Sequence, residues 1–151
     1  MKEKKKFIIS LDEIGKVVDF LKNKFNLCQT FVFYGPLGAG KTTIIRKLLK
    51  ACDVTGPVTS PTFTYLNLYK NKTSQGFCHF DLYRIEKLKD FLAAGFDEYL
   101  NDPEVITFVE WPEIIEPLLK DGVCTVKIDY HPEPDKRIVV IETKNMQKKD
   151  A

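Results

Sequence analysis

The chain has 151 residues, of which 44% are hydrophobic and 29% are charged. Its 23 basic and 21 acidic residues give a formal net charge of +2, which is too even a balance to indicate a nucleic-acid-binding or membrane-surface protein. Length and composition predict one soluble globular domain over residues 1–151, with lysine-rich flexible tails at about 1–6 and 144–151. The alternative interpretation of these basic ends is contact with RNA or an acidic partner.

Cysteine spacing and hydropathy exclude further classes of protein. The four cysteines are widely spaced and form no C-x-x-C pair: Cys28, Cys52, Cys78 and Cys124. A zinc cluster or redox motif is therefore not predicted, and we expect buried, reduced thiols. No apolar stretch approaches the ~20 residues of a membrane-spanning helix, and Asp12 and Glu13 interrupt any signal-like segment. We expect a cytoplasmic protein without membrane contact.

The first half of the chain alternates strand-like runs with amphipathic helices. Residues 7–9 predict a short strand, and Ser10 with Glu13 three residues later is the capping-box pattern that begins a helix. Residues 30–34 are apolar on both faces, which favours a central parallel strand. Apolar residues at helical spacing predict one helix that ends at about residue 25 and another over 41–51.

The second half favours a mixed sheet. Strand-like runs at 63–69 and 77–83 flank a polar turn, which is typical of a hairpin. The remaining predicted elements are strands over 105–109, 123–128 and 137–141, short helices over 86–94 and 96–100, and a helix that begins at Pro112.

One segment carries the strongest chemical signal. It matches G-x-x-x-x-G-K-[ST] and consists of Gly35, Pro36, Leu37, Gly38, Ala39, Gly40, Lys41 and Thr42. An apolar strand enters it and a helix leaves it, which is the setting of a phosphate-binding P-loop. Loop amides and the helix N-terminus bind phosphate, Lys41 adds a positive charge, Thr42 is the expected Mg²⁺ ligand, and Thr43 is expected near the alpha phosphate. We therefore expect ATP or a related nucleotide with Mg²⁺, on an α/β, P-loop NTPase-like three-layer fold with a mixed, mostly parallel sheet flanked by helices.

Two acidic residues end apolar strands and are candidates for catalysis. Ligands of open α/β sheets bind outside the carboxyl ends of the strands, which places Asp81 and Glu110 near the nucleotide. Alternative roles for either acid are helix capping and solvent exposure. His79 lies on the same strand face as Asp81, where a buried hydrogen-bonded role and a catalytic role both remain open. Arg84 is open to a salt bridge or to phosphate contact.

Several segments together resemble one family. GPLGAGKTT, VTSPTFTYLNLY, HFDLYR and VEWPE are similar to the bacterial threonylcarbamoyladenosine-biosynthesis ATPases, the TsaE (YjeE) family, in the family's order over roughly residues 7–142. The resemblance implies an ATPase that acts with the partner proteins TsaB and TsaD. That complex modifies the adenosine next to the anticodon of tRNA, so tRNA is an indirect partner. The resemblance also implies that ATP turnover resets the partner complex between cycles.

The resemblance also implies roles for individual residues. Lys41 and Thr42 hold phosphates and magnesium, Asp81 is the Walker B-like acid, and Glu110 is a magnesium ligand or a water-orienting acid. Trp111 lies beside the site. These roles make Lys41, Asp81 and Glu110 the expected catalytic residues, and Thr42, Asp81 and Glu110 the expected metal ligands.

Two further regions are implied to contact the nucleotide. Ser60 and Thr62 belong to a switch-like segment that senses the terminal phosphate, although from the residues alone an ordinary turn is equally open. Ser10, Leu11 and Arg137 are implied to build an adenine pocket.

Three functions remain open on the residues. The first is an ATPase that is slow alone and stimulated by its partners, since no arginine is obviously placed as a finger. The second is a P-loop small-molecule kinase. The sequence shows no Arg-rich lid segment, which disfavours this function. The third is a nucleotide-sensing module in which the terminal phosphate only orders residues 53–63.

Overall fold

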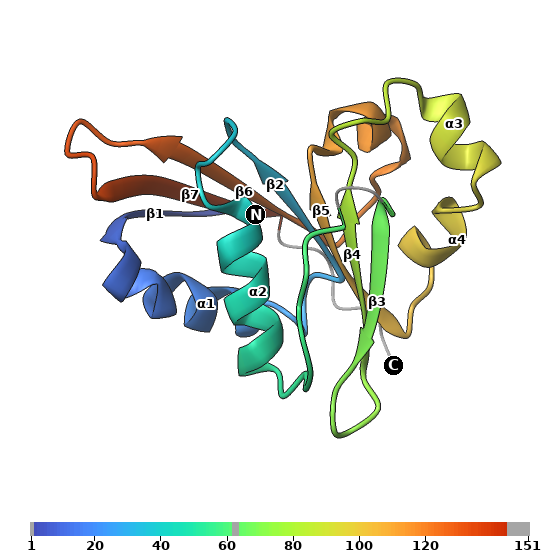
Figure 1. Cartoon of the computed structure of the whole chain (residues 1–151), viewed down its shortest axis with the longest axis horizontal. Helices are drawn as coiled ribbons and strands as arrows, with labels where there is room; N and C mark the ends of the chain where they lie inside the picture. Colours follow the sequence, from blue (N-terminus) through green and yellow to red (C-terminus); the bar gives the residue numbers. More distant parts are fainter. Residues whose placement is uncertain (1, 62–63, 145–151) are drawn as a thin grey trace.

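A single sheet of seven strands organises the molecule (Figure 1). The computed structural model describes residues 2–61 and 64–144. The strands are β1 (Lys2–Ser10), β2 (Thr30–Tyr34), β3 (Leu66–Lys70), β4 (Gly76–Asp81), β5 (Val105–Glu110), β6 (Val123–Tyr130) and β7 (Lys136–Lys144). Their order in the sheet is β1-β7-β6-β2-β5-β4-β3. Neighbours from β6 through β2 and β5 to β4 are parallel, and the outer pairings β1–β7, β7–β6 and β4–β3 are antiparallel, so the sheet is mixed as predicted.

Helices cover both faces of the sheet and complete three layers. The chain forms α1 (Ile14–Lys22), α2 (Lys41–Ala51), α3 (Leu88–Ala93) and α4 (Asp97–Leu100), with 3-10 helices η1 (Leu11–Glu13) and η2 (Pro112–Leu118). Phe31 and Phe33 of β2 belong to the apolar cluster that includes α1 and α2, whereas the alternate residue Val32 belongs to the cluster that includes α3 and η2. None of the described helices is long and apolar enough to cross a membrane.

The register of the central strands positions the candidate site. Phe33 pairs with Glu110, and Glu110 pairs with Asp81 on the far side of β5. Because β2, β5 and β4 are parallel, their carboxyl ends lie along the same side of the sheet, at the ends of its central strands. The two strand-end acids therefore lie near the segment that leaves β2.

The prediction of flexible tails is wrong for residues 2–6 and for residue 144. Lys2–Ser10 is one continuous strand, paired antiparallel with β7 from Lys2 opposite Lys144 to Ser10 opposite Lys136. Hydrogen bonds of the backbone hold this strand, while the side chains of residues 2–6 remain exposed. Residues 1 and 145–151 lie outside the described part of the chain.

Local features explain where other elements begin. Glu13 accepts hydrogen bonds from the backbone N and the hydroxyl of Ser10, at 3.2 and 3.1 Å, which confirms the predicted helix start. The predicted hairpin is present, but its first strand begins at Leu66 rather than residue 63. Tyr65 has a φ of 65°, a left-handed conformation that does not fit a strand. All four cysteines are buried and free, as predicted.

Candidate nucleotide-binding site

The P-loop joins the end of β2 to the start of α2. A Cβ on Gly35 would lie 2.5 Å from the carbonyl oxygen of Ile128 in β6, so the loop leaves the sheet where only glycine fits. Gly38 has a φ of 76° and Gly40 a φ of 114°, which favour glycine as well. The loop then enters α2 at Lys41, where the first turn of the helix presents backbone N–H groups. Backbone N–H groups at a helix N-terminus are suited to binding phosphate.

Side chains of β6 and β7 hold this loop from its outer side. The hydroxyl of Tyr130 donates to the carbonyl of Leu37, and Nε of Arg137 donates to the carbonyl of Ala39 at 3.2 Å. The Arg137 guanidinium also lies 5.0 Å from the centroid of the Tyr130 ring. Two loop carbonyls are therefore fixed by residues that lie almost a hundred positions away in the chain.

Lys41 is nearly buried at the entrance of α2. It is 5% exposed, its ammonium donates to the carbonyl of Gly35, and it lies 3.5 Å from the centroid of the Trp111 ring. Burial lowers the pKa of the Lys41 ammonium, and the nearby carboxylates of Glu110 and Asp81 oppose that effect. A phosphate group entering the loop would offer this charge a stronger partner than a carbonyl and an indole.

Thr42 and Glu110 meet at the floor of the site. The Thr42 hydroxyl donates to Oε1 of Glu110 at 2.7 Å, and Nε2 of His79 lies 2.6 Å from Oε2 of the same carboxylate. A hydroxyl and a carboxylate are hard oxygen donors that fit Mg²⁺, which keeps several waters and phosphate oxygens as its other ligands. Within the described residues no group of three His, Cys, Asp or Glu side chains could hold a metal by itself. The donor set therefore fits a magnesium ion shared with a nucleotide.

Asp81 lies beside Glu110 across the β4–β5 pair. One of its carboxylate oxygens accepts a hydrogen bond from the backbone N of Tyr83 at 3.1 Å, and burial raises the pKa of the Asp81 carboxyl. The backbone N of Leu82 donates to the carbonyl of Glu110 at 3.1 Å, which ties the two strand ends together. The hydroxyl of Thr42 donates to Glu110, so the structure links this acid, rather than Asp81, to the P-loop.

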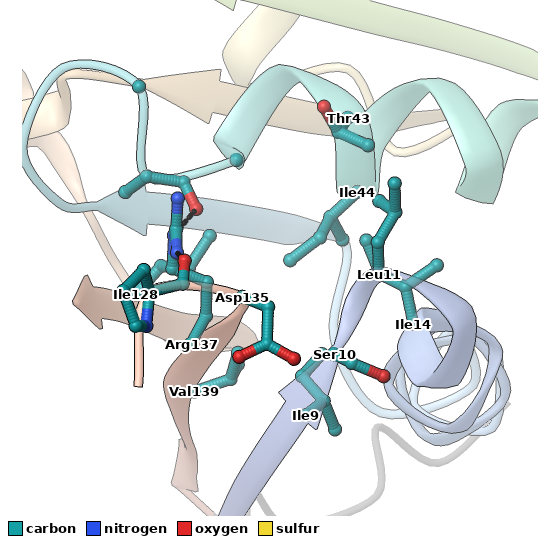
Figure 2. A pocket seen from close by; sticks show the side chains of 14 residues that line it. Ile9, Ser10, Leu11, Ile14, Thr43, Ile44, Ile128, Asp135, Arg137 and Val139 are labelled. Carbon is teal, nitrogen blue, oxygen red and sulfur yellow. Dashed lines mark hydrogen bonds between the residues drawn. The ribbon is translucent and has the colours of Figure 1, made fainter. Parts of the chain in front are cut away.

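A cavity of about 420 Å³ adjoins the P-loop on the side of β1 and β7 (Figure 2). Its lining includes Ser10, Leu11 and Arg137 together with Thr43, so the structure brings together three segments that are distant in sequence. Most of the remaining lining is apolar, which suits the faces of a nucleobase. Asp135 also lines it and carries a carboxylate that no sequence motif marked.

Other candidates lie outside this cavity. Ser60 is exposed on the segment that precedes β3 and does not line the cavity, and Thr62 lies outside the described residues. Thr59 is anchored to β3, because its carbonyl accepts from Nδ2 of Asn67 at 3.1 Å and from the hydroxyl of Tyr69 at 3.3 Å. A switch-like role of this segment stays a prediction.

The contacts of Tyr130 and Trp111 are among those that were not predicted. Tyr130, which donates to Leu37, follows the apolar run of its strand and matches no motif. Trp111, whose ring contacts the Lys41 ammonium, has a left-handed backbone conformation with a φ of 56°. Both contacts depend on strand register, which local sequence does not reveal. The nearest signal in the sequence is the position of Trp111 directly after a strand-end acid.

Comparisons with known proteins agree with this geometry. The profile of the family described as Threonylcarbamoyl adenosine biosynthesis protein TsaE matches residues 8–139. A tRNA threonylcarbamoyladenosine biosynthesis protein TsaE from Rickettsia felis is 31% identical over 137 residues, which are 90% of this chain and 78% of that protein. The protein of the same name from Haemophilus influenzae is 35% identical over 114 residues, 76% of this chain and 70% of that protein.

A solved structure extends the likeness to three dimensions. The fold is similar to the crystal structure of YdiB from Bacillus, with a TM-score of 0.72 and 26% identity, over 95% of this chain and 87% of that one. The seven-stranded mixed sheet with helices on both faces is thus a P-loop NTPase-like α/β fold. Since the family profile covers most of its length, this chain belongs to the TsaE family.

Proposed function

We propose that this chain is a Mg²⁺-dependent ATPase that supports threonylcarbamoyladenosine modification of tRNA by acting on a TsaB–TsaD complex in the cytoplasm. Its relatives carry the name of that biosynthesis, which supports the pathway. The observation that carries the proposal of hydrolysis is the 2.7 Å hydrogen bond between the P-loop hydroxyl of Thr42 and the strand-end carboxylate of Glu110. In P-loop NTPases a hydroxyl of the loop and a strand-end carboxylate are the protein groups that hold the magnesium ion of the nucleotide.

Each part of the site has a distinct task in this mechanism. The amides of the P-loop and the Lys41 ammonium neutralise the phosphates, and the cavity beside Ser10 and Arg137 takes the base. Thr42 and Glu110 would hold Mg²⁺, which would stabilise negative charge on the phosphates. We assign the task of orienting water to Asp81, which pairs with Glu110 across β4 and β5. Positioning and charge neutralisation therefore supply the rate.

Slow turnover by the chain alone is part of the proposal. The Lys41 ammonium is held by the Gly35 carbonyl and by the Trp111 ring. The ammonium has three N–H donors, so a phosphate can be added to these contacts or replace one of them. Slow turnover is expected because no arginine is obviously placed as a finger. We propose that the TsaB–TsaD complex stimulates hydrolysis, and that tRNA contributes through that complex.

The test is phosphate release by the purified chain, with and without the TsaB–TsaD complex. The parent should hydrolyse ATP slowly in Mg²⁺, faster with the complex, and not in EDTA. Glu110→Ala should abolish hydrolysis while calorimetry still detects bound ATP. Glu104→Ala is the matched control, because Glu104 is exposed and precedes the amino end of β5. Hydrolysis by Glu110→Ala at the parent rate would sink the proposal, and a stoichiometric phosphorylated acceptor would identify a kinase.

A further inference from the structure

A fully buried imidazole supports the strand-end acid from behind. His79 is 0% exposed in β4, and its Nε2 lies 2.6 Å from Oε2 of Glu110, which is itself 2% exposed. The two residues are diagonal neighbours on one sheet face, since His79 pairs with Phe108, two positions before Glu110 on β5. Each oxygen of the Glu110 carboxylate thus has its own partner, because Thr42 bonds to Oε1.

The second ring nitrogen identifies the donor. Within the described residues, Nδ1 of His79 is buried without a hydrogen-bond partner. A proton on Nδ1 would be a buried donor without an acceptor, which costs free energy. A proton on Nε2 instead donates to a carboxylate, which accepts. The imidazole therefore carries its proton on Nε2 and donates a hydrogen bond to Glu110.

The surroundings argue against a merely space-filling histidine. On the same face of the sheet, Phe77 and Phe108 are buried and stacked, with ring centroids 6.2 Å apart. A phenylalanine at position 79 would bury no unpaired nitrogen. The bond to Glu110 is the one polar contact of the His79 ring among the described residues, so it is the interaction that offsets the cost of burial.

We propose that His79 is a positioning residue for the metal ligand Glu110. By fixing Oε2, the imidazole sets the rotation of the carboxylate and keeps Oε1 at Thr42, where Mg²⁺ would bind. Groups that orient metal ligands in this way typically contribute about 10–100-fold in metal affinity. This inference rests on the proposed function, because it assigns His79 a task within the Mg–nucleotide site.

Three substitutions separate this task from packing. In His79→Gln the amide nitrogen reaches about as far as Nε2 of the histidine. In His79→Asn it reaches only as far as the histidine Nδ1, and His79→Leu has no donor. We expect His79→Gln to retain most of the metal affinity, and His79→Asn and His79→Leu to lose about 10–100-fold. The readout is Mn²⁺ binding in the presence of ADP, measured by electron paramagnetic resonance. Binding of a fluorescent ADP in EDTA should be unchanged in all three, and thermal unfolding verifies that each variant is folded.

The outcomes distinguish the two proposals. If the parent chain binds neither Mn²⁺–ADP nor ADP, the proposed function fails. If the parent binds Mn²⁺–ADP and folded His79→Leu binds it with equal affinity, the positioning role is wrong. Should His79→Leu not fold, the Gln and Asn variants decide, because equal Mn²⁺ affinities in these two would overturn the role of the donor.

Discussion

The hydroxyl of Thr42 and the carboxylate of Glu110 are 2.7 Å apart, although 68 positions separate them in the chain. This hydrogen bond joins the first turn of α2 to the end of β5. It gives the P-loop a preformed connection to a strand-end acid, and it makes the site sensitive to the loss of one hydroxyl group.

Replacing Thr42 tests this connection. Thr42→Val keeps the shape of the side chain but removes the donor, so the buried Glu110 carboxylate loses a partner. We expect a loss of about 1–3 kcal/mol in the free energy of unfolding, measured in urea, and loss of the Mg²⁺ dependence of ADP binding in calorimetry. Thr42→Ser should retain both properties. A Val variant with the parent's Mg²⁺ dependence would contradict the metal-ligand role of Thr42.

Lys41→Ala should weaken ATP binding. An ion-assisted hydrogen bond contributes about 1.5–3 kcal/mol, which corresponds to roughly 10- to 150-fold in the dissociation constant. Lys47→Ala provides the control, since Lys47 is exposed on the same helix and should bind ATP like the parent. Calorimetry on both folded variants makes the comparison. Equal affinities would mean that the Lys41 ammonium does not contact phosphate.

Two glycines should respond to alanine in opposite directions. In Gly35→Ala the new Cβ would lie 2.5 Å from the Ile128 carbonyl oxygen, so we expect a loss of about 1–3 kcal/mol in unfolding free energy and weaker nucleotide binding. In Gly15→Ala the Cβ would meet nothing within 4 Å, and Gly15 lies in α1. That variant should gain about 0.5–1 kcal/mol. Equal unfolding midpoints in the two variants would refute the close approach of the loop to β6.

The outer support of the P-loop can be weakened without touching the phosphate side. Tyr130→Phe removes only the hydroxyl that donates to Leu37. If this bond preorganises the loop, nucleotide affinity should fall by an amount equivalent to about 0.5–1.5 kcal/mol. Tyr99→Phe, in α4 on the opposite face of the sheet, should leave affinity unchanged. Fluorescent ADP titrations of the two variants provide the test.

The buried strands could be predicted because their residues leave few alternatives. Residues 30–34 and 105–109 are mostly apolar runs, and they lie in β2 and β5 of the parallel centre. The helix that begins at Pro112 is a 3-10 helix rather than an α-helix. Pro117 lies inside it, lacks a backbone N–H and would clash with the carbonyl four residues earlier in an α-helix. Length and Pro112 alone did not distinguish these two forms.

The site divides in the same way. The motif located Gly35 to Thr42 because local backbone conformation and chemistry are both encoded in those residues. Which strand-end acid meets Thr42 depends on side-chain directions at one sheet edge, and the sequence left Asp81 and Glu110 equivalent. The hydrogen bond from His79 to Glu110 could not be predicted either, because this diagonal contact depends on the β4–β5 register. Long-range pairing, rather than propensity, decides these contacts.

The lysines of β1 have a consequence for self-association. β1 is an edge strand, and an edge offers unpaired backbone groups to any other extended chain. A second copy that added itself there would bring ammonium groups of Lys2, Lys4 and Lys6 against its own, and this repulsion is strongest at low ionic strength. The lysines thus disfavour pairing of β1 with β1 of a second copy, and added salt weakens this repulsion.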